Sequence, residues 1–151
     1  GEPKHLMYEI LEVTIPLFPE DKPRYLMGVG APQSILEGVT RGIDMFDCVL
    51  PTRNGRNGSL FTYNGKISIG NTRYKDDLSP LDSNCQCYVC QNFSRAYLRH
   101  LYLAKEMLAP ILGTIHNLYF MNNLMKEIRK AISENYFDLF KNRFYKTYLS
   151  Q

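Results

Sequence analysis

The chain has 151 residues, 44% of them hydrophobic, and because single domains commonly hold ~100–200 residues, we expect one domain with a small extension rather than two independent domains. The formal net charge of +3 does not by itself identify a nucleic-acid-binding protein, because comparable values are common on solvated surfaces. No stretch approaches the roughly 20 apolar residues of a membrane-spanning helix and no secretory leader pattern opens the chain, so the sequence predicts a cytoplasmic protein without membrane contact.

The first fifty residues alternate between helical and extended patterns. Apolar spacing over residues 4–17 predicts a helix of about three turns. A short apolar run at 25–29 predicts a buried strand, residues 32–40 an amphipathic helix, and residues 43–50 a second strand. This order is typical of parallel α/β folds, in which functional groups gather at the carboxyl ends of the strands.

The middle of the chain does not continue this alternation of helices and strands. After a polar loop at 51–58, residues 60–69 predict a β-hairpin, because Asn64-Gly65 is the strongest short hairpin signal. A second polar loop, 74–84, leads to a group of cysteines.

The last sixty residues predict helices. Periodic apolar residues mark helices over 92–105 and 117–133, joined by a return leg that contains Pro110 and Gly113. The aromatic residues between 136 and 148 predict a last helix.

Cys85, Cys87 and Cys90 form a C-x-C-x-x-C knuckle. In a reducing compartment, clustered cysteines indicate metal ligands rather than disulfides. Three thiolates and one imidazole complete a tetrahedral zinc shell, and a closed shell is structural rather than catalytic. Cys48 stands apart in an apolar run, which is typical of a small buried hydrophobic residue.

Two histidines compete for the fourth ligand position. His100 lies about ten residues past the knuckle in a predicted helix, hence about 15 Å along its axis. His116 follows the return leg, which can bring it back to the thiolates. His5 is far from the knuckle in sequence. We therefore favour His116 over His100.

Asp47 stands in the apolar run 45–50, where a charge is costly unless partners compensate it. Two interpretations remain open. The pattern alone favours an aspartate that caps the turn after a strand, whereas the position at a strand end also fits a nucleophile or general base. Asp44, earlier on the same strand, is less well placed.

Arg53 and Arg56 lie in the glycine-containing loop that follows. Such a loop can approach a phosphate backbone, and arginine can bind base edges in a bidentate manner. Two loop arginines alone are weak evidence, since they more often mean solvated charge.

Taken together, these segments resemble the tRNA-guanine transglycosylases, in particular the bacterial branch. The matching segments are RYLMGVG at 24–30, GIDMFDCVLPTRNGRNG at 42–58, and the cysteine knuckle with Thr114-Ile115-His116-Asn117. The resemblance covers essentially the whole chain. It implies an α/β fold that is the C-terminal part of a TIM-type (β/α) barrel, its last two strands and helices, with an inserted β-hairpin and helical zinc-binding subdomain. Residues 1–58 and 116–151 would form the partial barrel and residues 59–116 the zinc-binding subdomain.

The implied activity is exchange of guanine at the tRNA wobble position for a 7-deazaguanine precursor of queuosine, through a covalent intermediate between Asp47 and the ribose. Family members are more than twice as long, and their N-terminal half carries a second catalytic aspartate. We therefore expect this chain to be a fragment that is inactive alone. The alternative is a non-catalytic, zinc-dependent RNA-binding module.

The resemblance also implies roles for individual residues. The base pocket would contain Tyr25, Met27 and Gly28. The RNA-binding segment would be Gly28, Val29, Gly30, Ala31, Pro32, Gln33 and Ser34. Wobble-base recognition would fall to Thr52, Arg53, Asn54, Gly55 and Arg56. The ligands of one structural Zn²⁺ would be Cys85, Cys87, Cys90 and His116. The expected partners are the tRNA anticodon stem-loop, guanine or a 7-deazaguanine-type base, and a second copy of the chain in a homodimer.

Overall fold

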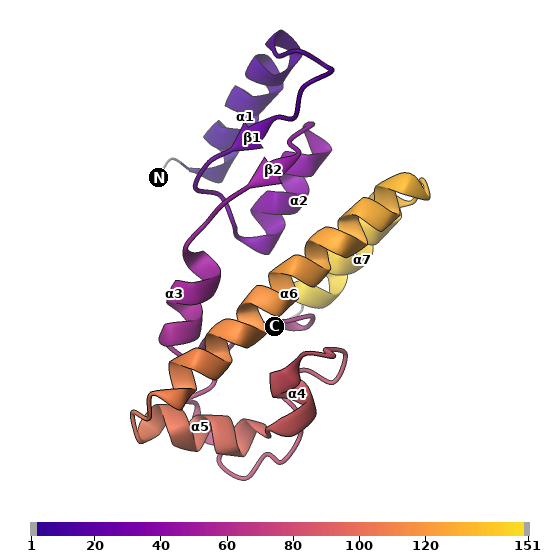
Figure 1. The fold of residues 1–151 in the computed structure, drawn as a ribbon. Helices are drawn as coiled ribbons and strands as arrows, with labels where there is room; N and C mark the ends of the chain where they lie inside the picture. Colours follow the sequence, from indigo (N-terminus) through magenta and orange to yellow (C-terminus); the bar gives the residue numbers. More distant parts are fainter. Residues whose placement is uncertain (1–2, 150–151) are drawn as a thin grey trace. The chain divides into compact units, whose positions relative to one another are not determined.

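The structure, a computed structural model, describes residues 3–149 (Figure 1). The chain divides into two compact units, one up to Leu50 and one from Pro51 onward. Each unit is described by itself below.

The first unit contains the predicted series of helix, strand, helix and strand. Its elements are α1 (Lys4–Thr14), the 3-10 turn η1 (Ile15–Leu17), β1 (Tyr25–Leu26), α2 (Pro32–Thr40) and β2 (Met45–Phe46). Strands β1 and β2 pair in parallel, with Tyr25 opposite Met45 and Leu26 opposite Phe46, as the α/β interpretation requires.

Both strands are shorter than predicted. The pairing ends after two residues because Gly28 adopts a φ of 72° and turns the chain away from the ladder. At the other end, Asp44 fixes the start of the pair, since the Arg24 N–H donates to Asp44 Oδ2 (2.8 Å) and the Asp44 N–H donates to the Arg24 carbonyl (2.9 Å). Asp44 therefore has a structural role.

The first unit buries a small core and leaves much apolar surface exposed. Leu11, Ile15 and Ile43 form the core, and Met7, Leu26 and Phe46 pack against it. The exposed apolar side chains include Ile10, Val13, Leu17, Met27, Met45 and Val49. Cys48, expected to be buried, is only half-buried.

The second unit combines a hairpin with helices. Its elements are α3 (Leu50–Arg56, which begins one residue before the unit), β3 (Ser59–Thr62), β4 (Gly65–Ser68), the 3-10 turn η2 (Thr72–Tyr74), α4 (Tyr88–Asn92), α5 (Arg95–Leu103), α6 (Leu108–Ser133) and α7 (Phe137–Tyr148). The predicted hairpin is confirmed, with Ser59 opposite Ser68 and Thr62 opposite Gly65. The cysteine knuckle belongs to the core of this unit, together with Leu60, Leu81, Leu98 and Leu112.

Residues 51–58 do not form the predicted loop, because Leu50–Arg56 is helical. Pro51 is compatible with this, since proline is tolerated in the first turn of a helix. Gly55 is buried against helix α6, where a β-carbon would lie 2.8 Å from the Thr114 backbone nitrogen. The glycine that favoured a loop in the sequence therefore serves close packing of two helices.

The predicted return leg at Pro110 and Gly113 is also wrong, because both residues lie inside helix α6. Pro110 is the third residue of that helix, where the backbone nitrogen needs no partner within the helix. The chain reverses earlier, at Lys105, which has a φ of 58°. The predicted helix at the C-terminal end is confirmed as α7, whose Phe144 and Tyr148 stack on each other at 4.9 Å.

The assignment of residues 1–58 and 116–151 to a barrel and of 59–116 to a zinc-binding subdomain stays a prediction. Residues 1, 2, 150 and 151 of these ranges lie outside the described residues. Within residues 3–149, no helix combines the length and apolar composition that crossing a membrane requires.

Candidate catalytic and metal sites

Asp47 lies directly after strand β2, at its carboxyl end. The Tyr25 hydroxyl donates to Asp47 Oδ1 at 2.7 Å, and the Gly28 N–H donates to the same oxygen at 2.9 Å. Both of these hydrogen bonds fall on Oδ1, and neither involves Oδ2. The two donors thus fix the orientation of the carboxylate through Oδ1.

The electrostatics keep Asp47 ionised. The Gly28 N–H, and after it the Tyr25 hydroxyl, lower the pKa of Asp47, and the same contact raises the pKa of Tyr25, which remains a donor. The side chain of Asp47 is exposed, so the expectation of a charge embedded among apolar residues is wrong. The Asp47 carboxylate accepts the N–H of Gly28, in the loop after strand β1, rather than capping the turn that follows strand β2.

Two glycines bring the loop after β1 close to the end of β2. The left-handed conformation of Gly28 disfavours any side chain there and aims its N–H at Asp47. At Gly30, a β-carbon would lie 2.3 Å from the β-carbon of Cys48, so only glycine permits this approach. Close packing of these two strand ends is what places a backbone donor beside the carboxylate.

The other residues of the predicted base pocket and RNA-binding segment differ in accessibility. Met27 is 73% exposed and Tyr25 is 46% exposed, so both can meet a ligand beside Asp47. In the segment 28–34, Gly30, Pro32 and Ser34 are buried, whereas Val29, Ala31 and Gln33 are half-buried. Their roles toward RNA stay predictions.

Helix α3 carries the residues predicted to read the wobble base. Arg53 and Arg56 are exposed and three residues apart, which places them on neighbouring positions of one helix face. Thr52 and Asn54 are half-buried and Gly55 is buried. The two guanidinium groups are at the C-terminal turn, where the helix dipole favours positive charge.

The predicted metal ligands Cys85, Cys87, Cys90 and His116 lie together, with all ligand atoms within 4.8 Å of one another. His116 Nδ1 is 3.9, 3.4 and 3.5 Å from the Sγ atoms of Cys85, Cys87 and Cys90. A tetrahedral zinc with bonds of ~2.3 Å to sulfur and ~2.0 Å to nitrogen separates such atoms by roughly 3.5 Å, so the donor set fits the ion. His100 is exposed on α5 and outside the group, which supports the choice of His116.

The ionisation of the cluster favours a cation at its centre. The Cys85 and then the Cys90 thiol lower the pKa of Cys87, while the same crowding by Cys85 and Cys87 raises the pKa of Cys90. Burial lowers the pKa of His116, but its contacts with Cys85 and Cys87 outweigh burial and raise that pKa to about 9. These groups shift one another's pKa values in opposite directions because thiolates and an imidazole are crowded together. A divalent metal would stabilise every ligand in its deprotonated form.

Local structure shapes this cluster. Cys87 is the N-cap of α4, and its Sγ accepts the Cys90 N–H at 3.4 Å. On the far side of the ring, His116 Nε2 donates to the Phe61 carbonyl at 2.6 Å, which fixes the tautomer with Nδ1 free to bind a metal. The sequence did not predict the Phe61 carbonyl as the hydrogen-bond partner of His116, because a backbone acceptor has no signature in the sequence.

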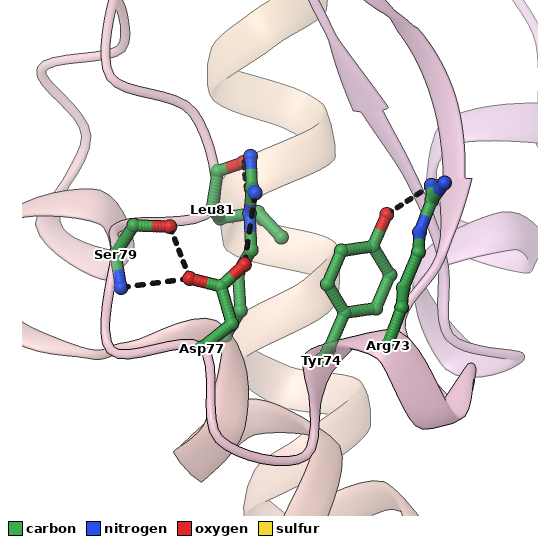
Figure 2. A network of polar contacts seen from close by, with 6 residues as sticks. Arg73, Tyr74, Asp77, Ser79 and Leu81 are labelled. Atoms are coloured by element: carbon green, nitrogen blue, oxygen red, sulfur yellow. Dashed lines mark hydrogen bonds and ion pairs between the residues drawn. The ribbon is translucent and has the colours of Figure 1, made fainter.

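The loop before the knuckle is held by a network of polar contacts (Figure 2). Asp77 Oδ1 accepts the Ser79 N–H at 3.0 Å and the Ser79 hydroxyl at 2.5 Å, and Asp77 Oδ2 pairs with Arg95 at 3.0 Å. Arg95 also donates to the Leu81 carbonyl at 3.0 Å. Since Arg95 opens helix α5, these bonds attach the loop to the helix that follows the knuckle.

Comparison with known proteins assigns the chain to a family. The model of the family described as "TGT: Queuine tRNA-ribosyltransferase" matches residues 1–150. This chain belongs to that family. The resemblance drawn from the motifs at 24–30, 42–58 and 85–90 is thereby confirmed.

Three bacterial relatives in this family are longer than this chain. Proteins named Queuine tRNA-ribosyltransferase from Thermoanaerobacter pseudethanolicus and Caldanaerobacter subterraneus subsp. tengcongensis are 57% and 58% identical over 148 residues, 98% of this chain and 40% of each relative. One from Desulforamulus reducens is 58% identical over 135 residues, 89% of this chain and 36% of the relative. The chain therefore spans about two fifths of the length of these relatives.

Proposed function

We propose that this chain is the C-terminal part of a tRNA-guanine transglycosylase, which replaces guanine at the wobble position of tRNA by a 7-deazaguanine precursor of queuosine. The observation that carries the proposal is the state of Asp47. Its carboxylate is exposed at a strand end, ionised, and bonded through Oδ1 to Tyr25 and Gly28. A nucleophile needs an available oxygen on a fixed carboxylate, and Oδ2 accepts neither of these two bonds.

The proposed reaction has two displacements at the anomeric carbon of one ribose. In the first, Asp47 Oδ2 bonds to that carbon while the bond to guanine breaks. The electron pair leaves with guanine, which takes up a proton from the second catalytic aspartate that the family resemblance implies in the N-terminal half. In the second, a ring nitrogen of the incoming base loses a proton and bonds to the carbon as the ester to Asp47 breaks. A carboxylate that captures an oxocarbenium-like centre divides one difficult displacement into two easier ones.

The side chains beside Asp47 would bind the base. The exposed thioether of Met27 can lie against a flat purine, while Tyr25 and the Gly28 N–H hold the carboxylate in place. The segment 28–34 would contact the RNA, and Arg53 and Arg56 on α3 would recognise the wobble base by bidentate hydrogen bonds.

We propose Zn²⁺ as the ion of the cysteine knuckle. Four buried protein ligands fill a tetrahedral shell and leave no position for substrate, which supports a structural role. The ion would hold the knuckle against helix α6 rather than take part in base exchange.

The rest of the protein would complete a (β/α) barrel, of which the first unit holds the last two strands. The exposed apolar residues of that unit, such as Ile10, Val13 and Leu17, support this proposal, because soluble proteins rarely leave a large apolar surface uncovered. We further propose a cytoplasmic homodimer that acts on the anticodon stem-loop of tRNA.

The test of the nucleophile supplies the N-terminal half and traps the covalent RNA adduct on a denaturing gel. Asp47→Asn should abolish the adduct with an anticodon stem-loop. Asp44→Asn is the matched control, because an amide oxygen can still accept the Arg24 N–H and the adduct should persist. An undiminished adduct with Asp47→Asn would contradict the assignment of Asp47 as the nucleophile.

The alternative is an RNA-binding module without catalysis. It predicts that the zinc-loaded protein binds the stem-loop with an affinity that falls with salt, yet exchanges no labelled guanine even when the N-terminal half is supplied. Guanine exchange that depends on Asp47 excludes this alternative.

A further inference from the structure

Helix α3 is bonded to the rest of the second unit through two backbone carbonyls. Near its start, the Pro51 carbonyl accepts a hydrogen bond from Asn117 Nδ2 at 3.0 Å. Near its end, the Gly55 carbonyl accepts a hydrogen bond from the Tyr102 hydroxyl. Arg53 lies between these two points and Arg56 directly after the second, so both arginines depend on them for their position.

The side-chain amide of Asn117 is buried and fully hydrogen-bonded. Asn117 is fully buried on α6, and its amide uses every group it has: Nδ2 donates to the Pro51 and Ser59 carbonyls, both at 3.0 Å, and Oδ1 accepts the Phe61 N–H at 3.0 Å. A buried amide with all its bonds satisfied specifies one arrangement, because any shift leaves polar groups unpaired. The side chain therefore fixes α3, β3 and α6 relative to one another.

Tyr102 fixes the other end of α3 from helix α5. Its ring lies against Gly58, and its hydroxyl occupies the space that a side chain at Gly113 would need. Burial raises the pKa of Tyr102 to about 12, so the hydroxyl keeps its proton and donates at neutral pH. The Gly55 carbonyl also accepts the Gly58 N–H at 3.2 Å, so loss of the hydroxyl alone leaves that carbonyl paired.

We propose that Asn117 and Tyr102 are positioning residues for RNA recognition, which hold helix α3 at both ends so that Arg53 and Arg56 meet the anticodon in a fixed orientation. This inference rests on the proposed function, because it takes the two arginines as the groups that read the RNA. Neither positioning residue needs to touch the RNA. Bidentate hydrogen bonds to a base tolerate little displacement. If α3 moves by a fraction of an ångström, the arginines lose discrimination between wobble bases before they lose their electrostatic attraction to the RNA.

The test uses the complete zinc-loaded transferase that contains this sequence. Tyr102→Phe removes one hydroxyl. Tyr63→Phe is the matched control, because the Tyr63 hydroxyl donates to Glu127 at 3.1 Å and accepts from Asn123 at 2.7 Å, two residues of α6 rather than of α3. The measurements are the Kd for an anticodon stem-loop with guanine at the exchanged position, the Kd for the same RNA with adenine there, and kcat with saturating RNA.

Tyr102→Phe should weaken binding of the guanine stem-loop roughly fivefold, the size of one neutral hydrogen bond, and should narrow the guanine-to-adenine ratio while kcat changes less than about twofold. Asn117→Ser should act in the same direction with a larger effect. Tyr63→Phe should change stability only. A merely structural role for Tyr102 would lower the unfolding midpoint and leave affinity and discrimination equal to those of Tyr63→Phe, and that result would overturn the inference.

The outcome separates this inference from the proposed function. If the unaltered protein binds the stem-loop but exchanges no guanine, the transglycosylase proposal fails, and the comparison of Tyr102→Phe with Tyr63→Phe still decides the positioning role. If Asn117→Ser does not fold, Tyr102→Phe decides it alone.

Discussion

Gly55→Ala is the sharpest probe of how α3 packs on α6. The added β-carbon would lie 2.8 Å from the Thr114 nitrogen and 2.9 Å from both the Gly113 carbonyl carbon and the Thr114 Cα, all backbone atoms that cannot rotate away. Helix α3 must therefore move by about 0.6 Å to reach an ordinary contact. Overpacking costs about 1–3 kcal/mol, and three close backbone contacts place this site in the upper part of that range, at about 2–3 kcal/mol. Alanine recovers about 1 kcal/mol of helix propensity, so we expect a net loss of about 1–2 kcal/mol.

Urea unfolding in the presence of excess zinc measures this loss. The midpoint for Gly55→Ala should fall by about 0.5–1 M, and stem-loop affinity should fall with it because the arginines move with their helix. Gly70→Ala is the control, since nothing lies within 4 Å of a β-carbon there. If Gly55→Ala is as stable as Gly70→Ala and binds RNA normally, the close helix contact does not hold α3 in place.

Three further predictions concern the metal and the carboxylate. Chelation should unfold the knuckle, seen by circular dichroism as one equivalent of zinc leaves; a protein that stays folded without metal contradicts the structural role. His116→Ala should lose the metal measured by mass spectrometry, whereas His100→Ala should retain it. Tyr25→Phe should raise the pKa of Asp47, because it removes the smaller of two donors. The native pKa is depressed, so the stabilisation by Asp47 is present above the unfolded value of about 4 and is lost as pH falls through the folded value. The acid limb of adduct formation should move to higher pH in Tyr25→Phe, and an unmoved limb contradicts the donor's role.

The sequence predicted features whose cause is local. The hairpin follows from Asn64-Gly65, and the parallel order of the first unit follows from alternating apolar runs. The knuckle follows from ligand spacing, and axial rise disfavoured His100. The choice of His116 was right although the return leg that supported it lies inside α6 and the chain reverses at Lys105 instead.

Features caused by packing were not predictable from the sequence. The glycines and asparagines of 51–58 are typical of a loop, yet this segment is helical because Gly55 meets the α6 backbone, 58 residues further along the chain at Gly113. Asp47 was expected among apolar neighbours because its sequence neighbours are apolar, but short strands and the Gly28 turn leave it exposed. Tertiary packing outweighed local propensity at Gly55, whereas the early end of the two strands decided the exposure of Asp47.

If the proposed function holds, the position of the metal cluster links the proposed zinc ion to RNA recognition without any part in the chemistry. His116 and Asn117 are consecutive on α6 and bind the same residue of β3: His116 donates to the Phe61 carbonyl, and Asn117 accepts the Phe61 N–H. A bound metal fixes His116, and His116 thereby fixes the register between α6 and β3. That register is also what aims Asn117 Nδ2 at the Pro51 carbonyl of α3. Loss of the metal would release the Phe61 contact first, and with it the hold on the helix that carries Arg53 and Arg56, so RNA discrimination should weaken before the knuckle unfolds as a chelator removes the metal.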